Sequence, residues 1–512
     1  MNGKSNWPTA ILLAGALCAL TGWAQPIPNP ILPGFYSDPS ACTANGKYCL
    51  AVSSLQYFPA IPLFESVDLV HWKLVGHAIE KPGVVPLGGN PEFAGMFAPT
   101  IRFRNGRFYM TVGNHACFAD GKPQGPVILY ADRFEGPWSV PRKIEGLDRP
   151  YGDPSIDFVD GKCYFSGTTG FEVRVAEMDA DAGRLLEKPR AVWSGTGGTY
   201  PEGQHVFRRG EWIYLMMAEG GTEYGHTHVI ARSKSVYGPF AGCPRNPIAG
   251  HARLAHQGHP LQAVGHGDFV YDRDGNGHFI CHAIRPQSGR HHTLGRETVI
   301  APITWESDGW PLVNGGKGVE YVENTENLPV RDWVYIRNPT LENYRIDEGS
   351  GVVALVPSPV KLTDADSPTF VGTRQVKFDQ TFSGTLLEPP GRDVEAGLAD
   401  YMGRTHHYAI AVENRGGTCV AFVRYQLGIM SFASEAVAIE RFPVELKIVS
   451  RQKEIVFYAN GRQLGKGDPR HISSETDSDS PYGGLVCGFY AVGNASSGEV
   501  RFRYDGQTEK RK

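Results

Sequence analysis

The amino-acid sequence predicts an all-β protein in which a five-bladed β-propeller precedes a C-terminal β-sandwich. Its 512 residues include 62 glycines and 37 prolines, which is the turn chemistry of many short strands. A glycine turn followed by a short aromatic strand recurs five times at the spacing of propeller blades. Near the C-terminus, residues 500–504 alternate apolar and charged side chains, as a half-buried strand does.

The first 24 residues have the pattern of a secretory signal peptide. Lys4 precedes an apolar run over residues 10–20, and the small residues Gly22 and Ala24 follow that run. The run is too short to cross a bilayer, and no later segment reaches the roughly 20 apolar residues that a membrane-spanning helix needs. We therefore expect export to the periplasm or the extracellular space, without a membrane span.

Five glycine turns mark the propeller, and successive turn glycines are 60, 55, 49 and 67 residues apart. This spacing suits one four-stranded blade per repeat, with each glycine in a hairpin between two successive strands. A β-sandwich gives no reason for the same turn to recur at this interval. The five glycines are Gly46, Gly106, Gly161, Gly210 and Gly277.

Three acids stand at one fixed distance before these turns. Eight residues before the first four glycines are Asp38, Ala98, Asp153 and Glu202. Equivalent positions on the innermost strands of a propeller lie at equal height around its axis, so we expect the three carboxyl groups to converge. An offset of eleven, across the longer turn of the fifth repeat, reaches His266, which we expect to complete the ring.

Each of these residues alone has an ordinary structural explanation. Aspartate before proline commonly begins a turn, and a loop glutamate or a hydrogen-bonded core histidine needs no catalytic role. The shared offset favours a function, because like charges brought together push their pKa values apart. Glycoside hydrolysis uses that separation, since it needs one protonated and one ionised carboxyl group.

Eight cysteines follow the leader, and none has the spacing of zinc ligands. If Asn45 and Gly46 form a two-residue turn, Cys42 lies directly opposite Cys49. Two interpretations of this pair remain open. One is a cross-strand disulfide in an oxidising compartment, and the other is two small strand residues with free thiols.

Around the acids the sequence resembles glycoside hydrolase family 43, the inverting β-xylosidases and α-L-arabinofuranosidases built on a five-bladed propeller. The resemblance covers nearly the whole mature chain. It implies that Asp38 is the general base that activates water, that Glu202 is the general acid, and that Asp153 modulates the pKa of that acid. The matching segments are residues 29–40 (NPILPGFYSDPS), 97–100 (FAPT), 152–155 (GDPS), 201–205 (PEGQH), 218–222 (AEGGT) and 294–298 (LGRET).

The resemblance also implies which residues contact the sugar. The expected substrate contacts are Phe35, Phe97, Arg296 and His266. Phe97 takes the place of a tryptophan that many relatives use as a sugar-facing platform. His266 is expected on the propeller axis, where some relatives hold a calcium ion or a water molecule. No other cofactor is implied.

We expect the propeller to occupy residues 25–327 and the sandwich residues 328–512, where segments 367–372 and 500–504 resemble the C-terminal module of the xylosidase branch. In such enzymes the module covers one side of the active site. The resemblance therefore implies an exo-acting enzyme that removes terminal xylose or arabinofuranose from xylan-derived oligosaccharides.

A formal net charge of −4 gives no electrostatic reason to bind nucleic acid. Two alternative functions fit the same architecture. One is a retaining hydrolase of the fructosidase type, and the other is a propeller that binds carbohydrate without cleaving it. The sequence makes no prediction about oligomeric state.

Overall fold

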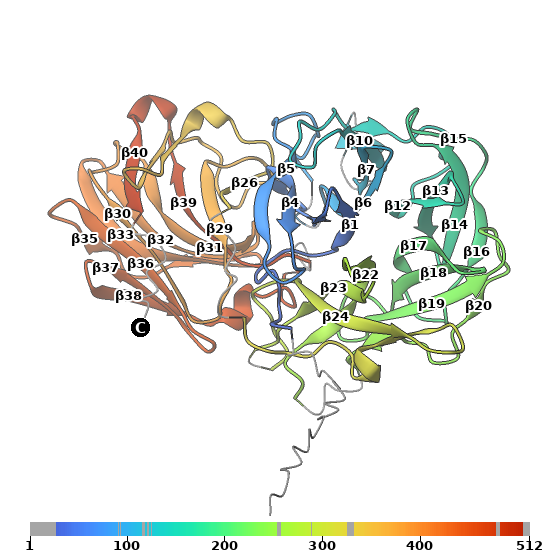
Figure 1. Ribbon diagram of the computed structural model, residues 1–512. Helices are drawn as coiled ribbons and strands as arrows, with labels where there is room; N and C mark the ends of the chain where they lie inside the picture. The colour runs from blue at the N-terminus through green and yellow to red at the C-terminus, as the bar shows by residue number, and fades with distance from the viewer. Residues whose placement is uncertain are drawn as a thin grey trace, which may run out of the picture.

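The structure, a computed structural model, describes residues 27–504 except 91, 93, 115–117, 120, 121, 124, 253–257, 288, 325–331 and 478–481. The predicted signal peptide (residues 1–24) and the predicted boundary between residues 327 and 328 lie outside the described residues. A propeller and a two-sheet sandwich lie side by side (Figure 1). The predicted fold class is confirmed. Among the described residues, no helix is long and apolar enough to cross a membrane.

Each blade is an antiparallel sheet, and the first strands of the blades contact one another around the axis. Three blades have four strands, and the third and fourth blades have a fifth short strand. A small hairpin, β8 (Phe118–Ala119) and β9 (Lys122–Pro123), stands apart from the blades. The first blade contains β1 (Ser40–Ala44), β2 (Lys47–Ala51), β4 (Ala60–Ser66) and β5 (Lys73–Ile79), and the second contains β6 (Phe97–Arg104), β7 (Arg107–Gly113), β10 (Val127–Ala131) and β11 (Arg142–Lys143). The third contains β12 (Gly152–Val159), β13 (Lys162–Thr169), β14 (Glu172–Asp179), β15 (Arg184–Leu185) and β16 (Arg190–Trp193), and the fourth contains β17 (Glu202–Arg209), β18 (Trp212–Glu219), β19 (Thr227–Ser233), β20 (Ala241–Gly242) and β21 (Ala249–Gly250). The fifth contains β22 (Gln262–Tyr271), β23 (Gly277–Ile284), β24 (Glu297–Trp305) and β25 (Pro311–Val313).

The segment before the first blade closes the ring against the last blade. Leu32 forms an isolated bridge with Thr298 of β24. The side chain of Asn29 donates to the carbonyl of Ile300 at 2.9 Å, and the amide of Ile300 donates to Asn29 Oδ1 at 2.9 Å. Because Tyr36 also donates its amide to the carbonyl of Arg296, this closure places Asp38 beside the fifth blade.

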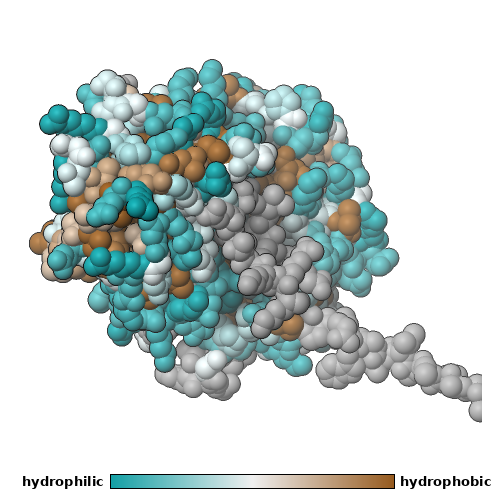
Figure 2. All heavy atoms as spheres, turned by 90° about the vertical axis from the view of Figure 1, so that its left-hand side faces the viewer, coloured by the Kyte–Doolittle hydropathy of each residue, from teal (hydrophilic) through white to brown (hydrophobic). Residues whose placement is uncertain are grey.

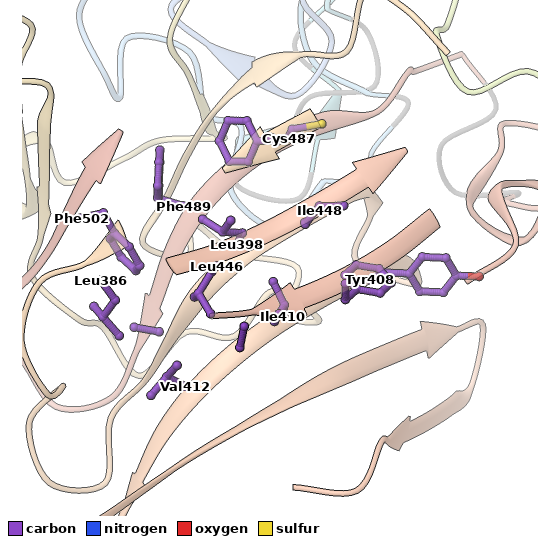
Figure 3. Packing of buried hydrophobic residues seen from close by; sticks show 14 of the residues in the cluster. Leu386, Leu398, Tyr408, Ile410, Val412, Leu446, Ile448, Cys487, Phe489 and Phe502 are labelled. Atoms are coloured by element: carbon purple, nitrogen blue, oxygen red, sulfur yellow. The ribbon is translucent and has the colours of Figure 1, made fainter. Parts of the chain in front are cut away.

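The sandwich consists of a nine-stranded and a seven-stranded sheet around one large apolar core, part of which Figure 3 shows. The first sheet contains β3 (Tyr57–Phe58), β26 (Val334–Ile336), β29 (Phe370–Arg374), β39 (Val486–Val492), β31 (Glu395–Gly403), β32 (His406–Arg415), β33 (Thr418–Leu427), β34 (Met430–Ala433) and β35 (Val437–Ala438). The second contains β27 (Tyr344–Asp347), β28 (Val352–Leu355), β40 (Val500–Tyr504), β30 (Gln380–Leu386), β36 (Val444–Ser450), β37 (Ile455–Ala459) and β38 (Arg462–Gly467). The described residues include the short 3₁₀ helices η2 (Asn314–Gly316), η3 (Leu341–Asn343), η4 (Pro469–Ile472) and η5 (Ala495–Ser497).

The two domains share a sheet and a core. Strand β3 comes from the chain of the first blade but pairs with β26, so it is an outer strand of the sandwich. Leu55 and Tyr57 from this segment pack in one apolar cluster with Phe370 and Tyr490 of the sandwich. The end of the sandwich seen in Figure 2 is mostly hydrophilic, with scattered hydrophobic spots.

Cys42 and Cys49 are directly opposite each other, as the turn pattern predicted. Both are free thiols, so the structure does not contain the disulfide that was one of the two interpretations. Directly opposed strand residues usually have Cβ atoms ~4.5–5.5 Å apart, whereas a disulfide needs about 3.8 Å. The two thiols nevertheless interact, because the hydrogen bond with Cys42 is the largest cause of the raised pKa of Cys49.

We expect Phe489→Ala to lower the free energy of unfolding of the sandwich by about 3–5 kcal/mol, because Phe489 is fully buried in its core. Phe432→Ala is the matched control, since Phe432 is 51% exposed in the same domain and a surface change costs about 0.5 kcal/mol. Urea denaturation followed by near-ultraviolet circular dichroism measures both. Equal losses for the two variants would contradict this location of the core.

Candidate active site

Three carboxyl groups from three blades surround one imidazole. His266 Nδ1 lies 3.6 Å from Asp38 Oδ1, 3.7 Å from Asp153 Oδ2 and 3.8 Å from Glu202 Oε1. The structure thus brings together the three predicted acids and the predicted histidine. Their side chains differ in exposure: 4% for Asp38, 13% for Asp153 and 25% for Glu202. Glu202 is the acid most open to solvent.

A backbone irregularity at the start of each innermost strand aims these side chains. Asp38, Ala98, Asp153 and His266 all have a positive φ, between 44° and 54°. Around these residues the registers of β6, β12 and β22 shift against the next strand, as at a β-bulge. A bulge of this kind bends the strand and re-aims a side chain, here toward the axis.

Glu202 does not occupy the position equivalent to Asp153, although its equal distance from the turn glycine predicted that it would. In blades one to three the turn glycine is the second turn residue, but in blade four Arg209 pairs with Trp212, so Gly210 is the first. Counting back eight residues from Gly210 therefore reaches Glu202 instead of the equivalent position, residue 203. Glu202 pairs as Gly152 does, and the residue equivalent to Asp153 is Gly203, with a φ of 57°.

Steric exclusion explains this shift in blade four. A Cβ atom on Gly203 would lie 2.6 Å from the ring of His266, so no acid fits at the equivalent position. Glutamate, one methylene longer than aspartate, reaches the same imidazole from the preceding residue. The amide of Gly203 also donates to Asp153 Oδ2 at 3.1 Å, which links the two neighbouring acids.

Asp38 is held by four donors. Arg296 Nη1 donates to Oδ1 at 2.8 Å, and Arg296 Nη2 donates to Oδ2 at 3.4 Å. The hydroxyl groups of Ser37 and Ser53 donate to Oδ2 at 3.0 and 2.5 Å. Burial acts to raise the pKa of Asp38, but Arg296, His266 and His282 outweigh it and hold the pKa well below its usual range. Asp38 is therefore ionised.

Asp153 and Glu202 have opposite pKa shifts. Burial raises the pKa of Asp153 to about 7, with Glu202 and Asp38 adding to the rise and His266 opposing it. For Glu202 burial acts upward too, but the hydrogen bond to His266 and the nearby His226 lower its pKa below the ordinary value. An oxygen of each acid lies within 4.8 Å of the other and of His266. Below pH 7 this pair retains one proton.

His266 supplies the balancing positive charge. Burial lowers its pKa, but Asp38, Glu202 and Asp153 together raise it to about 9. By contrast, burial lowers the pKa of His226 to about 4 and that of His282 well below its usual range. One imidazolium and one guanidinium thus face three carboxyl groups, one of which is protonated.

Of the other three predicted sugar contacts, Arg296 reaches the site, Phe97 is partly buried and Phe35 is fully buried. Arg296 reaches the site, where it bonds Asp38 and donates to Thr222 Oγ1 at 3.2 Å. Phe97 is partly buried, with Gly113 under its ring and the shared core of the two domains beside it. Phe35 has no exposed surface, because its ring packs edge-on against Tyr57 in that core. The prediction that Phe35 faces the sugar is therefore corrected.

Sequence reasoning missed several residues of the site. Ser53, in the loop after β2, and His282, in β23, contact Asp38, and Ser53 also accepts the amide of Ala98 at 2.8 Å. Tyr482 comes from the sandwich, where its ring lies 5.3 Å from the Arg296 guanidinium and its carbonyl accepts from Arg296 Nε at 3.5 Å. None of these residues has a motif or a shared offset in the sequence, so no signal marked them.

The donor set around His266 does not fit a calcium ion bound directly by protein. Calcium takes about six to eight oxygen ligands. The two candidate ligand groups here are Asp38 with His266 and His282, and Asp153 with Glu202 and His266, so neither offers more than two carboxylates. The contacts of His266 instead suit a proton on its ring.

A cavity of about 470 Å³ opens at the far ends of the innermost strands, and the acids do not line it. Its lining includes Thr43, Arg104, Phe158, Arg208 and Tyr271, each near the hairpin end of its strand. The cavity and the acids thus lie at opposite ends of the propeller axis.

Both parts of the chain match known protein families. Residues 27–311 match the family model described as "Glycosyl hydrolases family 43", and residues 324–505 match "Beta xylosidase C-terminal Concanavalin A-like domain". A Bacteroides ovatus protein named "Non-reducing end alpha-L-arabinofuranosidase BoGH43B" is 36% identical over 96% of this chain and 97% of its own. A "Xylosidase/arabinosidase" of Butyrivibrio fibrisolvens is 34% identical over 75% and 79%.

Solved structures show the same two-domain arrangement. The Bacteroides ovatus structure described as "Xyloglucan PUL GH43B" matches with a TM-score of 0.85 and 34% identity, over 93% of this chain and 98% of that chain. The GH43 BlXynB protein from Bacillus licheniformis matches with a TM-score of 0.83 and 28% identity, over the same shares of both chains.

We expect the hydrolytic rate to fall by about tenfold per pH unit above pH 7, because the pKa of Asp153 is about 7 and the shared proton is lost above it. Asp153→Asn leaves Glu202 as the only carboxyl of the pair, next to the His266 imidazolium that lowers its pKa. The alkaline limb of kcat should then move to lower pH. An unchanged limb would contradict a proton shared by these two acids.

Proposed function

This chain belongs to family 43 of the glycosyl hydrolases, and we propose that it is an exported, inverting, exo-acting hydrolase that removes terminal xylose or arabinofuranose from xylan-derived oligosaccharides. The observation that carries the proposal is the arrangement of three carboxyl groups of unequal pKa around His266. Glycoside hydrolysis needs one ionised and one protonated carboxyl group on either side of the bond.

Asp38 is the general base in this mechanism. Its pKa is held well below the usual range, and its four donors fix its orientation. Because a carboxylate offers about four lone-pair sites, those donors leave no free site for a water molecule. When a sugar enters, an N–H of Arg296 turns from Asp38 to a sugar hydroxyl, and the freed oxygen takes the proton of the attacking water.

Glu202 is the general acid, and Asp153 stores its proton. Without substrate, the lower pKa of Glu202 leaves the shared proton on Asp153. A bound sugar removes water from the partly exposed side chain of Glu202. Dehydration favours the neutral form of a carboxyl group, so the proton moves to Glu202 and then to the leaving oxygen.

An inverting reaction needs room for water between the base and the anomeric carbon, with carboxyl groups about 6.5–9.5 Å apart. Asp38 Oδ1 and Glu202 Oε1 lie 3.6 and 3.8 Å from one nitrogen, so their separation cannot exceed the sum of these two distances. The two oxygens are therefore no farther apart than the inverting range allows, and both face the same imidazole nitrogen.

Exo action follows from the way the sandwich covers one side of the site. The amide of Leu485 donates to the carbonyl of Thr293 at 2.8 Å, and a Cβ atom on Gly484 would lie 2.7 Å from the carbonyl of Leu294. Backbone packing this close leaves no passage between the sandwich loop and the residues before Arg296. A polysaccharide cannot pass between these two segments, which supports binding of a chain end.

The identity of the released sugar is open between two pentoses, and the names of relatives include both. Hydrolysis of 4-nitrophenyl α-L-arabinofuranoside and 4-nitrophenyl β-D-xyloside, beside oligosaccharides from xylan and xyloglucan, identifies it. Release of no pentose from any member of the panel would remove the proposed function and leave a carbohydrate-binding propeller. Proton NMR of the first-formed anomer separates inversion from a retaining, fructosidase-like reaction.

Export and cofactor independence are part of the same proposal. The charged start and apolar run of residues 1–24 support export, and mass spectrometry of the N-terminus of the mature protein from its native host tests it. For the cofactor, full activity after dialysis against EDTA is the expected result, since protein groups alone supply both the acid and the base.

We expect Glu202→Ala to lower the rate on unactivated oligosaccharides by about 10³-fold or more and to affect 4-nitrophenyl glycosides much less, since a good leaving group needs little protonation. Asp38→Ala should reduce both rates alike, because water activation is common to both substrates. Steady-state kinetics on the two substrate types measures the contrast. Equal, small losses in Glu202→Ala would count against its role as the acid.

A further inference from the structure

An exposed aromatic ring stands two residues before the general acid. Tyr200 is 67% exposed, one of the few large hydrophobic side chains so open among the described residues. Its φ of 51° lies in the left-handed region, which residues other than glycine rarely adopt. Backbone strain of this kind persists where the surrounding structure holds it, often beside a functional site.

The loop that carries Tyr200 is fixed from behind. The amide of Thr196 donates to the buried carboxylate of Glu219 at 2.9 Å, and the amide of Gly220 donates to the carbonyl of Thr199 at 2.7 Å. A Cβ atom on Gly198 would lie 2.7 Å from the same carboxylate, so the loop packs tightly against it. These contacts hold the backbone while leaving the tyrosine ring in solvent.

The ring lies at the mouth of the active site. A Cβ atom on Gly221 would lie 3.6 Å from Tyr200 Cδ2, so the ring covers Gly221. The next residue, Thr222, accepts a hydrogen bond from Arg296, and the carbonyl of Gly221 lies 2.6 Å from His226 Nδ1. Tyr200 therefore stands on the blade-four side of the mouth, next to the strand that carries Glu202.

We propose that Tyr200 is the platform of the leaving-group subsite, where the sugar that leaves stacks on its ring. The general acid must face the glycosidic oxygen, so the leaving sugar lies on the Glu202 side of the cleaved bond. An exposed ring held rigidly on that side offers an apolar face to the C–H groups of a pyranose. This inference rests on the proposed function, and it assigns the next sugar of the chain to a residue of blade four.

The test compares a substrate whose leaving group is a sugar with one whose leaving group has no ring. Suitable substrates are the oligosaccharide that the wild-type enzyme cleaves best and the glycosyl fluoride of the same terminal pentose. We expect Tyr200→Ala to lower kcat/KM for the oligosaccharide about five- to tenfold and to leave that for the fluoride within twofold. Tyr200→Phe, which keeps the ring, should behave as wild type on both substrates.

Two further variants keep the test interpretable. Tyr200→Asn removes the ring but tolerates the left-handed backbone, so it should reproduce the alanine result even if alanine disturbs the loop. Phe432→Ala removes another exposed ring, 51% exposed in β34 of the sandwich, and should change neither rate.

The outcomes separate the two proposals. Equal losses on both substrates, or no loss on the oligosaccharide, in both Tyr200→Ala and Tyr200→Asn would overturn the platform while leaving the hydrolase intact. A wild-type enzyme that cleaves neither substrate would overturn the proposed function, and the platform with it.

Discussion

The electrostatic balance around His266 is the constraint on which the site depends. Three carboxyl groups from three blades lie within 4 Å of one imidazole nitrogen, and a guanidinium binds the most buried of them. Without these two cations, burial would raise the pKa of each of the three carboxyl groups. With them, one acid is ionised and the other two share a proton. The unequal charge states that hydrolysis needs therefore exist before substrate binds.

The sandwich belongs to this balance although it contributes no acid. Arg296 is held on one side by Asp38 and on the other by the ring and the carbonyl of Tyr482. Strand β3, taken from the first blade, pairs within the sandwich sheet, and the domains share an apolar core. Because sheet, core and site all cross the boundary, the two domains act as one catalytic body rather than as an enzyme with an attached module.

Much of this architecture was predictable, for identifiable reasons. Local turn chemistry repeats in the sequence, so the five blades, the opposed Cys42 and Cys49 and the convergence of Asp38 and Asp153 followed from spacing. Glu202 instead reaches the site from one residue before the equivalent position. Residues that depend on tertiary packing had no such signal: Tyr482 arrives from the other domain, and Ser53 acts from a loop without a motif. Phe35 illustrates the same limit, since this motif residue, three positions before Asp38, is buried in the core that the two domains share.

The one-residue displacement of Glu202 adds to the asymmetry of the active site around the propeller axis. Five equal blades would produce a ring with near fivefold rotational symmetry, in which a sugar could dock in several equivalent poses. Ala98 and His266 already break that symmetry. Gly203 breaks it further, because the imidazole occupies the space of its side chain and the carboxyl group comes from the longer side chain of the preceding residue. The site thus has distinct entry and departure sides, and a bound sugar has one orientation in which both acids reach the scissile bond.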